Sequence, residues 1–328
     1  MRQRSVCVFG AGSWGTALAM VLARQGRPVT LLARTPQIAE EMQQRRENTK
    51  YLPAIRFPNS LIVQHNIPAA LEQAGAVVLA LPCSATIDLL PSLTGVNKPV
   101  IAACKGLNPK NLERMDETLL HHIGAEYAAL LSGPSFAAEV AQGMPTAITM
   151  AASSEKLARH AASFFEDPSF RIYTSSDMTG VAMGGALKNI IAIAAGVAEG
   201  LNLGHNTAAA LITRGIYEIS RLAVACGGKP ETLSGLSGLG DLVLTCTGSL
   251  SRNRKMGMAL ASGMDVNAAR MHVGQVVEGE RSALAACRLA KNMGIDMPIT
   301  QGVQALLSGK VSPQQVVQTL LARPEKNE

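Results

Sequence analysis

A glycine-rich segment near the start of the chain restricts its possible folds more than any other feature. Residues 10–15 read Gly-Ala-Gly-Ser-Trp-Gly, follow the apolar run 6–9 and precede a helical pattern. In such a strand–turn–helix unit, Gly10 allows a tight turn, Gly12 lets the backbone approach a ligand, and Gly15 lets the helix pack closely on the sheet. The helix N-terminus would then bind a pyrophosphate with its free N–H groups and positive dipole. The segment predicts a dinucleotide-binding turn, although a glycine-rich turn without a ligand can have the same sequence.

The first half of the chain alternates short apolar runs with helical patterns. We expect strands at residues 6–9, 29–32, 76–80, 100–103, 128–131 and 147–150. These runs are almost entirely apolar, which is typical of strands that helices cover on both faces. The alternation indicates an α/β fold, namely a doubly wound Rossmann domain with a mainly parallel sheet.

After about residue 174, helical patterns replace the strands. We expect helices at residues 186–199, 207–226, 254–262, 279–293 and 313–322. Hardly any strand pattern lies among them. We therefore predict a dinucleotide-binding Rossmann domain at residues 1–180 and an all-helical substrate-binding domain at residues 181–328.

The composition favours a small anionic ligand over a nucleic acid. Hydrophobic residues make up 47% of the 328 residues and charged residues 16%, which supports a large buried core. The net charge is +6, but the chain has no long Lys/Arg run, and aromatic residues amount to only 3%. A basic patch with stacking aromatics is therefore not available for nucleic-acid binding.

The cysteines and the apolar segments indicate where the protein resides. The six cysteines are widely separated, and no Cys-x-x-Cys pair is present for zinc binding, so we expect reduced thiols and no metal site. The N-terminus lacks the apolar region of a signal peptide. The longest apolar stretch, residues 190–198, is far shorter than the roughly 20 residues that span a bilayer. We expect a cytoplasmic protein with no transmembrane segment, and the apolar helical half makes a homodimer plausible.

The end of the second expected strand indicates which dinucleotide is bound. Sites for NAD usually carry Asp or Glu there, to bind the ribose hydroxyls. Here Arg34 follows the strand, and no acidic residue occurs before Glu40. Arg34 could bind a 2′-phosphate, which favours NADPH over NADH, or it could only cover the adenine ring.

Two further polar groups follow expected strands, at the sheet edge where open α/β sheets bind their ligands. Lys105 comes directly after the strand at 100–103, so its side chain should project towards that edge. Ser135 lies in the segment Ser-Gly-Pro-Ser-Phe-Ala that follows the strand at 128–131. Each has a simpler explanation, because Lys105 could be a solvated loop lysine and Ser135 a helix N-cap.

Lys188 stands near the start of the helical half, on the same helix face as Ala192, Ala195 and Glu199. A lysine within such an apolar helix loses hydration, which lowers its pKa towards the value that a proton-transferring group needs. The alternative is a lysine whose ammonium extends to the surface.

Asp241 and residues 249–254 complete the set of candidate residues. Asp241 ends a Gly-Leu-Gly-Asp segment, and residues 249–254 read Ser-Leu-Ser-Arg-Asn-Arg. The latter is typical of a helix start with hydroxyl, amide and guanidinium donors for a phosphate. An N-cap followed by two exposed arginines would have the same sequence.

These segments together resemble the NAD(P)-dependent glycerol-3-phosphate dehydrogenases of the bacterial type. The similarity extends over nearly all of the chain. Its segments are residues 10–19, 105–107, 132–137, 185–189, 238–247, 251–253 and 274–279. Seven segments in the same order are far more specific than any one of them.

The resemblance implies a role for each matching position. Cofactor contacts are implied for Ser13, Trp14, Arg34, Ala137, Val276 and Glu278. Contacts with both cofactor and substrate are implied for Lys105 and Arg252. Substrate contacts are implied for Gly133, Ser135, Asp241, Ser251 and Asn253. Lys188 matches the proton acceptor. Trp14 stands where the family often has Phe or Tyr, and Ser135 where it often has Thr, so the apolar bulk and the hydroxyl are kept.

The implied activity is the reversible reduction of dihydroxyacetone phosphate to sn-glycerol 3-phosphate, which supplies glycerophospholipid synthesis. Lys188 would exchange a proton with the substrate oxygen, Asp241 would orient Lys188, and Lys105 would add positive potential. One alternative is a related two-domain dehydrogenase that acts on a hydroxy or keto acid. Another is a nucleotide-sensing regulator without turnover.

Overall fold

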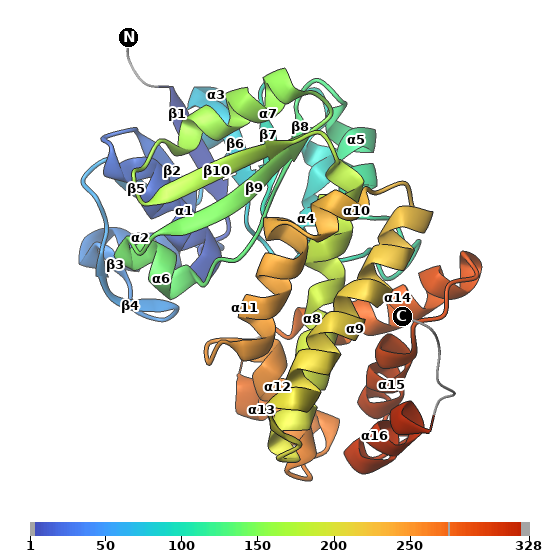
Figure 1. Cartoon of the computed structure of the whole chain (residues 1–328). Helices are drawn as coiled ribbons and strands as arrows, with labels where there is room; N and C mark the ends of the chain where they lie inside the picture. Colours follow the sequence, from blue (N-terminus) through green and yellow to red (C-terminus); the bar gives the residue numbers. More distant parts are fainter. Residues whose placement is uncertain (1–3, 275, 323–328) are drawn as a thin grey trace. The chain divides into compact units, whose positions relative to one another are not determined.

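A computed structural model describes residues 4–274 and 276–322 and divides the chain into two units (Figure 1). The first unit comprises Met1–Lys105 and Met115–Val181, and the second comprises Gly106–Arg114 and Ala182–Glu328. The short segment Gly106–Arg114 thus belongs with the second half of the chain. The division into a dinucleotide-binding domain at residues 1–180 and a substrate-binding domain at residues 181–328 stays a prediction.

The first unit contains an eight-stranded sheet with the order β10-β9-β8-β7-β6-β1-β2-β5. The strands are β1 (Ser5–Phe9), β2 (Val29–Leu32), β5 (Leu61–Gln64), β6 (Ala74–Leu79), β7 (Val100–Ala102), β8 (Ala128–Ser132), β9 (Thr146–Ala152) and β10 (Phe170–Ser175). All pairs are parallel except β8 with β9. The chain proceeds from β1 to β2 and β5 on one side and returns to β6 on the other. The carboxyl end of β1 therefore lies at a topological switch point, where such sheets bind ligands.

The mainly parallel sheet confirms the fold class predicted from the apolar runs. Consecutive residues of β1 point to opposite faces, yet Val6, Cys7 and Val8 are all buried, so both faces are covered. β5 and β10 were not expected, nor was the two-stranded sheet of β3 (Glu47–Asn48) and β4 (Leu52–Arg56). β4, β5 and β10 each contain exposed residues, and β3 is only two residues long. Such edge strands lack the continuous apolar run that marked the central ones.

Helices of the first unit cover the sheet. They are α1 (Ser13–Arg24), α2 (Pro36–Arg45), α3 (Ile67–Gln73), α4 (Cys83–Leu89), α5 (Met115–Ile123), α6 (Ala137–Gln142) and α7 (Glu155–Ala162), with short 3₁₀ helices at Leu90–Leu93 and Ser163–Phe165. Leu18 and Leu22 of α1 share one buried cluster with Leu31 of β2 and Ile148 of β9. Removing one such leucine side chain would cost about 2–5 kcal/mol, so this core fixes α1 against the sheet.

The second unit is built around the long helix α8 (Met178–Gly200), of which the part from Ala182 belongs to it. The other helices are α9 (Gly204–Ala225), α10 (Pro230–Leu233), α11 (Asp241–Thr247), α12 (Arg252–Ala261), α13 (Val266–Val273), α14 (Glu278–Asn292), α15 (Pro298–Leu307) and α16 (Pro313–Leu321), with a π-helical turn at Leu236–Gly240. The predicted helical character of this half is confirmed. α8 begins at Met178 rather than at residue 186, because Asp177 accepts a hydrogen bond from the Gly180 N–H and caps the first turn of the helix.

α8 is the central helix of the second unit. A Cβ atom on Gly196 would lie 2.0 Å from the backbone oxygen of Arg254. The absence of a side chain at Gly196 therefore lets the backbone of α12 pack directly against the backbone of α8. By length and composition α8 is the one helix in the described chain that could cross a bilayer, but 89% of its apolar window is buried inside the protein. Its apolar character is therefore explained by its place in the core.

Candidate active site

The turn between β1 and α1 has the geometry of an anion site. Gly10 has φ +106°, and a Cβ on Gly15 would lie 1.8 Å from the Gly10 oxygen, so neither position accepts a side chain. A Cβ on Gly12 would meet nothing within 4 Å. Gly12 is the N-cap of α1 and offers no side-chain cap, which leaves the first N–H groups of the helix without a side-chain partner. Open space at an uncapped helix N-terminus fits the pyrophosphate of a dinucleotide.

Two side chains hold this turn in place. The indole N–H of Trp14 donates to the Ala103 carbonyl, 3.0 Å away, which ties the start of α1 to the end of β7. Asn48 is only 2% exposed, and its amide donates to the Ala11 carbonyl at 3.0 Å and to Thr16 Oγ1 at 2.8 Å. Asn48 was not among the residues expected at the site. It lies in the short strand β3 and follows no periodic pattern that could have marked it.

Arg34 is exposed directly after β2, and Thr35 accepts a hydrogen bond from the Ile38 N–H as the N-cap of α2. An exposed guanidinium at the carboxyl end of β2 could contact the 2′-phosphate of NADPH, and it could equally stack on the adenine ring of either dinucleotide. The choice between these two roles stays a prediction.

Lys105 and Ser135 converge on one backbone carbonyl. Lys105 Nζ donates to the Gly133 oxygen at 3.2 Å, and Ser135 Oγ donates to the same oxygen at 3.0 Å. The expected alternative that Ser135 caps a helix is wrong, because Phe136 is the N-cap of α6 and Ala137 its first residue. Ser132 Oγ, at the end of β8, is the one buried side-chain polar atom without a hydrogen-bond partner among the described residues. The Ser135 hydroxyl and the Lys105 ammonium thus lie together at the end of β8.

Lys188 is the centre of a buried cluster in the second unit. Its side chain is 9% exposed, and Nζ donates to Oδ1 of Asp241, which is 1% exposed, and to Thr245 Oγ1 at 2.8 Å. The Thr245 hydroxyl in turn donates to the Asp241 carbonyl at 2.6 Å. The alternative of an ammonium that extends to the surface is therefore wrong. The carboxylate and the hydroxyl hold the amine in one position.

Thr245 was missed in the sequence, although a signal existed. It follows Asp241 by four residues inside the matched segment 238–247, and α11 begins at Asp241. On a helix, residues four apart lie on one face. The spacing would have placed Thr245 beside Asp241 if a helix had been expected there.

The segment 251–253 is partly explained by helix capping. Ser251 is the N-cap of α12 and accepts a hydrogen bond from the Arg254 N–H. Asn253 donates to Asn189 Oδ1 and accepts from the Gly279 N–H, both at 2.9 Å. The alternative of two exposed arginines is wrong for Arg254, whose Nε donates to Glu199 Oε2 at 2.6 Å and whose side chain is 15% exposed.

Arg252 and Glu278 form an electrostatic pair within the second unit. Desolvation lowers the pKa of the Arg252 guanidinium, while the nearby Glu278 raises it. Desolvation also raises the pKa of Glu278, and Arg252 opposes that shift. Glu278 is the first residue of α14, and Val276, two residues earlier, is 39% exposed. Gln275, which belongs to the matched segment 274–279, lies outside the described residues.

Comparison with known proteins places the chain in one family. Residues 5–158 match the family described as NAD-dependent glycerol-3-phosphate dehydrogenase N-terminus, and residues 177–318 match the corresponding C-terminus. A glycerol-3-phosphate dehydrogenase [NAD(P)+] of Stenotrophomonas maltophilia is 45% identical and is aligned over 98% of this chain and 96% of its own. One from Moorella thermoacetica is 46% identical over 99% and 98% of the two chains.

A solved structure agrees with these matches. The crystal structure of glycerol-3-phosphate dehydrogenase from Coxiella burnetii has a TM-score of 0.94 to this chain at 40% identity and covers 98% of this chain and 100% of its own. The family resemblance inferred from the seven segments is thus confirmed over both units. The chain belongs to the NAD-dependent glycerol-3-phosphate dehydrogenase family.

Proposed function

We propose that the protein catalyses the reversible NAD(P)H-dependent reduction of dihydroxyacetone phosphate to sn-glycerol 3-phosphate. The observation that carries this proposal is the buried hydrogen-bonded cluster of Lys188, Asp241 and Thr245. A ketone reduction needs a group that supplies a proton to the oxygen, and a positioned amine can do so. Relatives at 45% and 46% identity carry the name of this enzyme. A nucleotide sensor without turnover would have no use for such a cluster.

When bound, the cofactor would supply the hydride for the ketone carbon. Residues 10–15 would hold its pyrophosphate with the N–H groups at the start of α1, in the open space beside Gly12. The other proposed cofactor contacts are Lys105, Ala137, Arg252, Val276 and Glu278. Arg34 would bind the 2′-phosphate and so make NADPH preferred over NADH.

Lys188 acts on the substrate oxygen. As an ammonium it stabilises the negative charge that develops there and gives up a proton, and in the oxidative direction it accepts the hydroxyl proton. Asp241 and Thr245 orient its amine through their hydrogen bonds. Lys105 adds positive potential at the substrate.

The substrate phosphate is held away from the reacting carbon. We assign it to the start of α12, with Ser251, Arg252 and Asn253, and we assign Gly133 and Ser135 to further substrate contacts. Binding energy from the phosphate positions the carbon for hydride transfer. A hydroxy- or keto-acid dehydrogenase would not need a phosphate site.

The test is NADPH oxidation with dihydroxyacetone phosphate, measured for the wild type and Lys188→Ala. We expect kcat to fall roughly 100-fold or more, with the NADPH dissociation constant from a fluorescence titration almost unchanged. Lys188→Met, which keeps the bulk of the side chain, should lose activity equally. Lys255→Ala, at an exposed lysine of α12, is the matched control. A folded Lys188 variant with near-normal turnover would refute the assignment.

We also propose that the protein acts in the cytoplasm as a homodimer, supplies glycerol phosphate to glycerophospholipid synthesis and does not bind nucleic acid. Support for a dimer comes from large apolar side chains exposed on the second unit, such as Val224, Leu284 and Met271. Light scattering after gel filtration should give twice the mass of one chain. A single-chain mass at micromolar concentration would contradict the dimer.

A further inference from the structure

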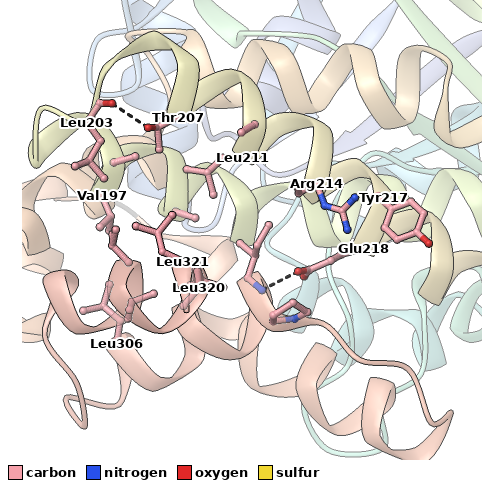
Figure 2. Close-up of a pocket in the computed structure, with 18 of the residues that line it drawn as sticks. Val197, Leu203, Thr207, Leu211, Arg214, Tyr217, Glu218, Leu306, Leu320 and Leu321 are labelled. Carbon is pink, nitrogen blue, oxygen red and sulfur yellow. Dashed lines mark hydrogen bonds between the residues drawn. The ribbon is translucent and has the colours of Figure 1, made fainter. Parts of the chain in front are cut away.

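The second unit contains a cavity that the proposed reaction does not use. Its volume is about 840 Å³, and its walls come from α8, α9, α15 and α16 (Figure 2). Cavities that bind small molecules measure roughly 300–1,000 Å³ and are mostly apolar with a few polar groups. This cavity has the size and composition of such a site.

One part of the cavity is apolar. Val197 of α8, Leu211 of α9, Leu306 of α15 and Leu320 of α16 face the same space in Figure 2. α16 contributes no fully buried residue, and its Leu321 is 80% exposed. Val197 and Leu306 are already buried, but Leu211 and Leu320 are only partly buried. An apolar chain that removed these two leucines and Leu321 from water would be stabilised there.

The other part of the cavity carries two guanidinium groups. Arg214, Tyr217 and Arg221 follow one another at three- and four-residue spacing, which places them on one face of α9. The guanidinium carbon atoms of Arg214 and Arg221 lie 4.9 and 5.9 Å from the centre of the Tyr217 ring. Within the described chain neither arginine forms an ion pair, and Arg221 makes only a long hydrogen bond of 3.4 Å to the Asp296 carbonyl. Both guanidinium groups keep donors for a further anion.

Two carboxylates also line this part, but Glu218 is already engaged. Its oxygens accept hydrogen bonds from Ile299 N at 2.7 Å and from Thr300 N and Oγ1, both at 3.2 Å, at the start of α15. Asp296 lies nearby and acts electrostatically on Glu218. Because the Glu218 acceptors serve the start of α15 and Asp296 is not free either, the arginines are the groups to which an anionic partner can bind. Their forked donors match a carboxylate or a phosphate.

We propose that this cavity binds a free single-chain amphiphile with an anionic head group, of which a fatty acid is the simplest case. The acyl chain lies among the apolar side chains of α8, α9, α15 and α16. The carboxylate binds Arg214 and Arg221, next to the Tyr217 ring. Binding is non-covalent and does not depend on the reaction at Lys188.

The test is calorimetric titration of the full chain with laurate, kept monomeric at a pH where its carboxyl is ionised. We expect one site per chain, and the double variant Arg214→Ala/Arg221→Ala should weaken binding by roughly ten-fold or more. The matched control is Arg171→Ala in the first unit. The guanidinium carbon of Arg171 also lies beside a tyrosine, 5.3 Å from the centre of the Tyr173 ring, but Arg171 does not line the cavity. Dodecyltrimethylammonium, with the same chain length and the opposite charge, should bind at least ten-fold more weakly.

A second variant tests whether the acyl chain of the ligand lies inside the cavity. Ala210 lines the cavity and is exposed, so Ala210→Trp should fill part of the space, abolish laurate binding and leave NADPH oxidation unchanged. Absence of laurate binding to the wild type, or equal binding of the cationic amphiphile, would overturn the proposal. So would a dimer that dissociates on Ala210→Trp without any laurate binding, because a second copy would then cover the cavity. Binding to anionic vesicles but not to free laurate would assign the surface to a membrane and would also overturn it.

Discussion

The glycine turn of the first unit and the lysine cluster of the second unit place polar groups in two different ways. In the turn, residues 10–15 present backbone N–H groups at an uncapped helix start, beside open space. In the lysine cluster, the side chains of Lys188, Asp241 and Thr245 bond to one another while buried. The first arrangement depends on the path of the backbone, and the second on the identity of each partner. Substitutions should therefore affect the two places differently.

The largest effect on stability is expected in the lysine cluster. Asp241→Ala would leave the Lys188 ammonium buried without its carboxylate, and breaking a buried pair in this way costs about 3–5 kcal/mol. Urea unfolding of the variant and the wild type would measure the loss. If the free energy of unfolding stayed within error of the wild-type value, Lys188 would not be held as a buried charge.

A pair on the surface provides the control for Asp241. Glu155 bonds to Arg159 at 2.6 Å on α7, and both side chains are well exposed. Glu155→Ala should cost less than about 1 kcal/mol, because water replaces the lost partner. A comparable loss at both positions would show that burial does not decide the difference.

The glycine turn should separate stability from ligand binding. Gly15→Ala places a Cβ against the Gly10 carbonyl, so we expect a loss of about 3 kcal/mol in the free energy of unfolding. Gly12→Ala meets nothing within 4 Å and should cost less than about 1 kcal/mol. Its methyl group would nevertheless occupy the proposed pyrophosphate space, so NADPH affinity should fall sharply. A Gly12→Ala protein with normal NADPH affinity would place the cofactor elsewhere.

The same contrast explains what the sequence could predict. The turn is local, and its glycine spacing after an apolar strand was enough to locate β1, α1 and the helix N-terminus. The central strands were also predictable, because burial on both faces leaves a continuous apolar run. β10 and β5 were missed, since their exposed residues interrupt that run.

The partners of the candidate residues were harder to predict, because they come from distant parts of the chain. Lys188 was recognisable as an amine in an apolar helix, but its bond to Thr245 joins residues 57 positions apart. Asn48 reaches Ala11 from a two-residue strand that no periodic pattern marks. Leu107 packs in the core of the second unit although its neighbour Lys105 belongs to the first. Such contacts depend on the folded path of the chain.

Glu218 offers a second test of a buried side chain, this time through pH. Burial raises the pKa of its carboxyl to about 7, and the hydrogen bonds from Ile299 and Thr300 oppose the shift only in part. Between the ordinary value of 4.5 and about 7, the folded chain keeps a proton that the unfolded chain has lost. The free energy of unfolding should therefore fall as the pH rises through this window.

Glu218→Gln should remove this dependence. Relative to the variant, we expect the wild type to lose about 2 kcal/mol between pH 5 and pH 7, measured by urea unfolding at each pH. Glu155→Gln, at an exposed carboxyl, serves as the control and should follow the wild-type curve. Parallel curves for the wild type and Glu218→Gln would mean that Glu218 is ionised over the whole range.

The smallest effect concerns Arg34, whose exposed side chain would add to the backbone contacts that the glycine turn makes. Arg34→Ala should lower kcat/KM for NADPH by roughly ten-fold and leave kcat/KM for NADH almost unchanged, because only NADPH carries the 2′-phosphate. Arg56→Ala, at another exposed arginine of the first unit, should change neither value. An equal loss with both cofactors would mean that Arg34 covers the adenine ring that they share. In that case the turn would bind either dinucleotide through its backbone, and the preference for NADPH would have to come from another residue.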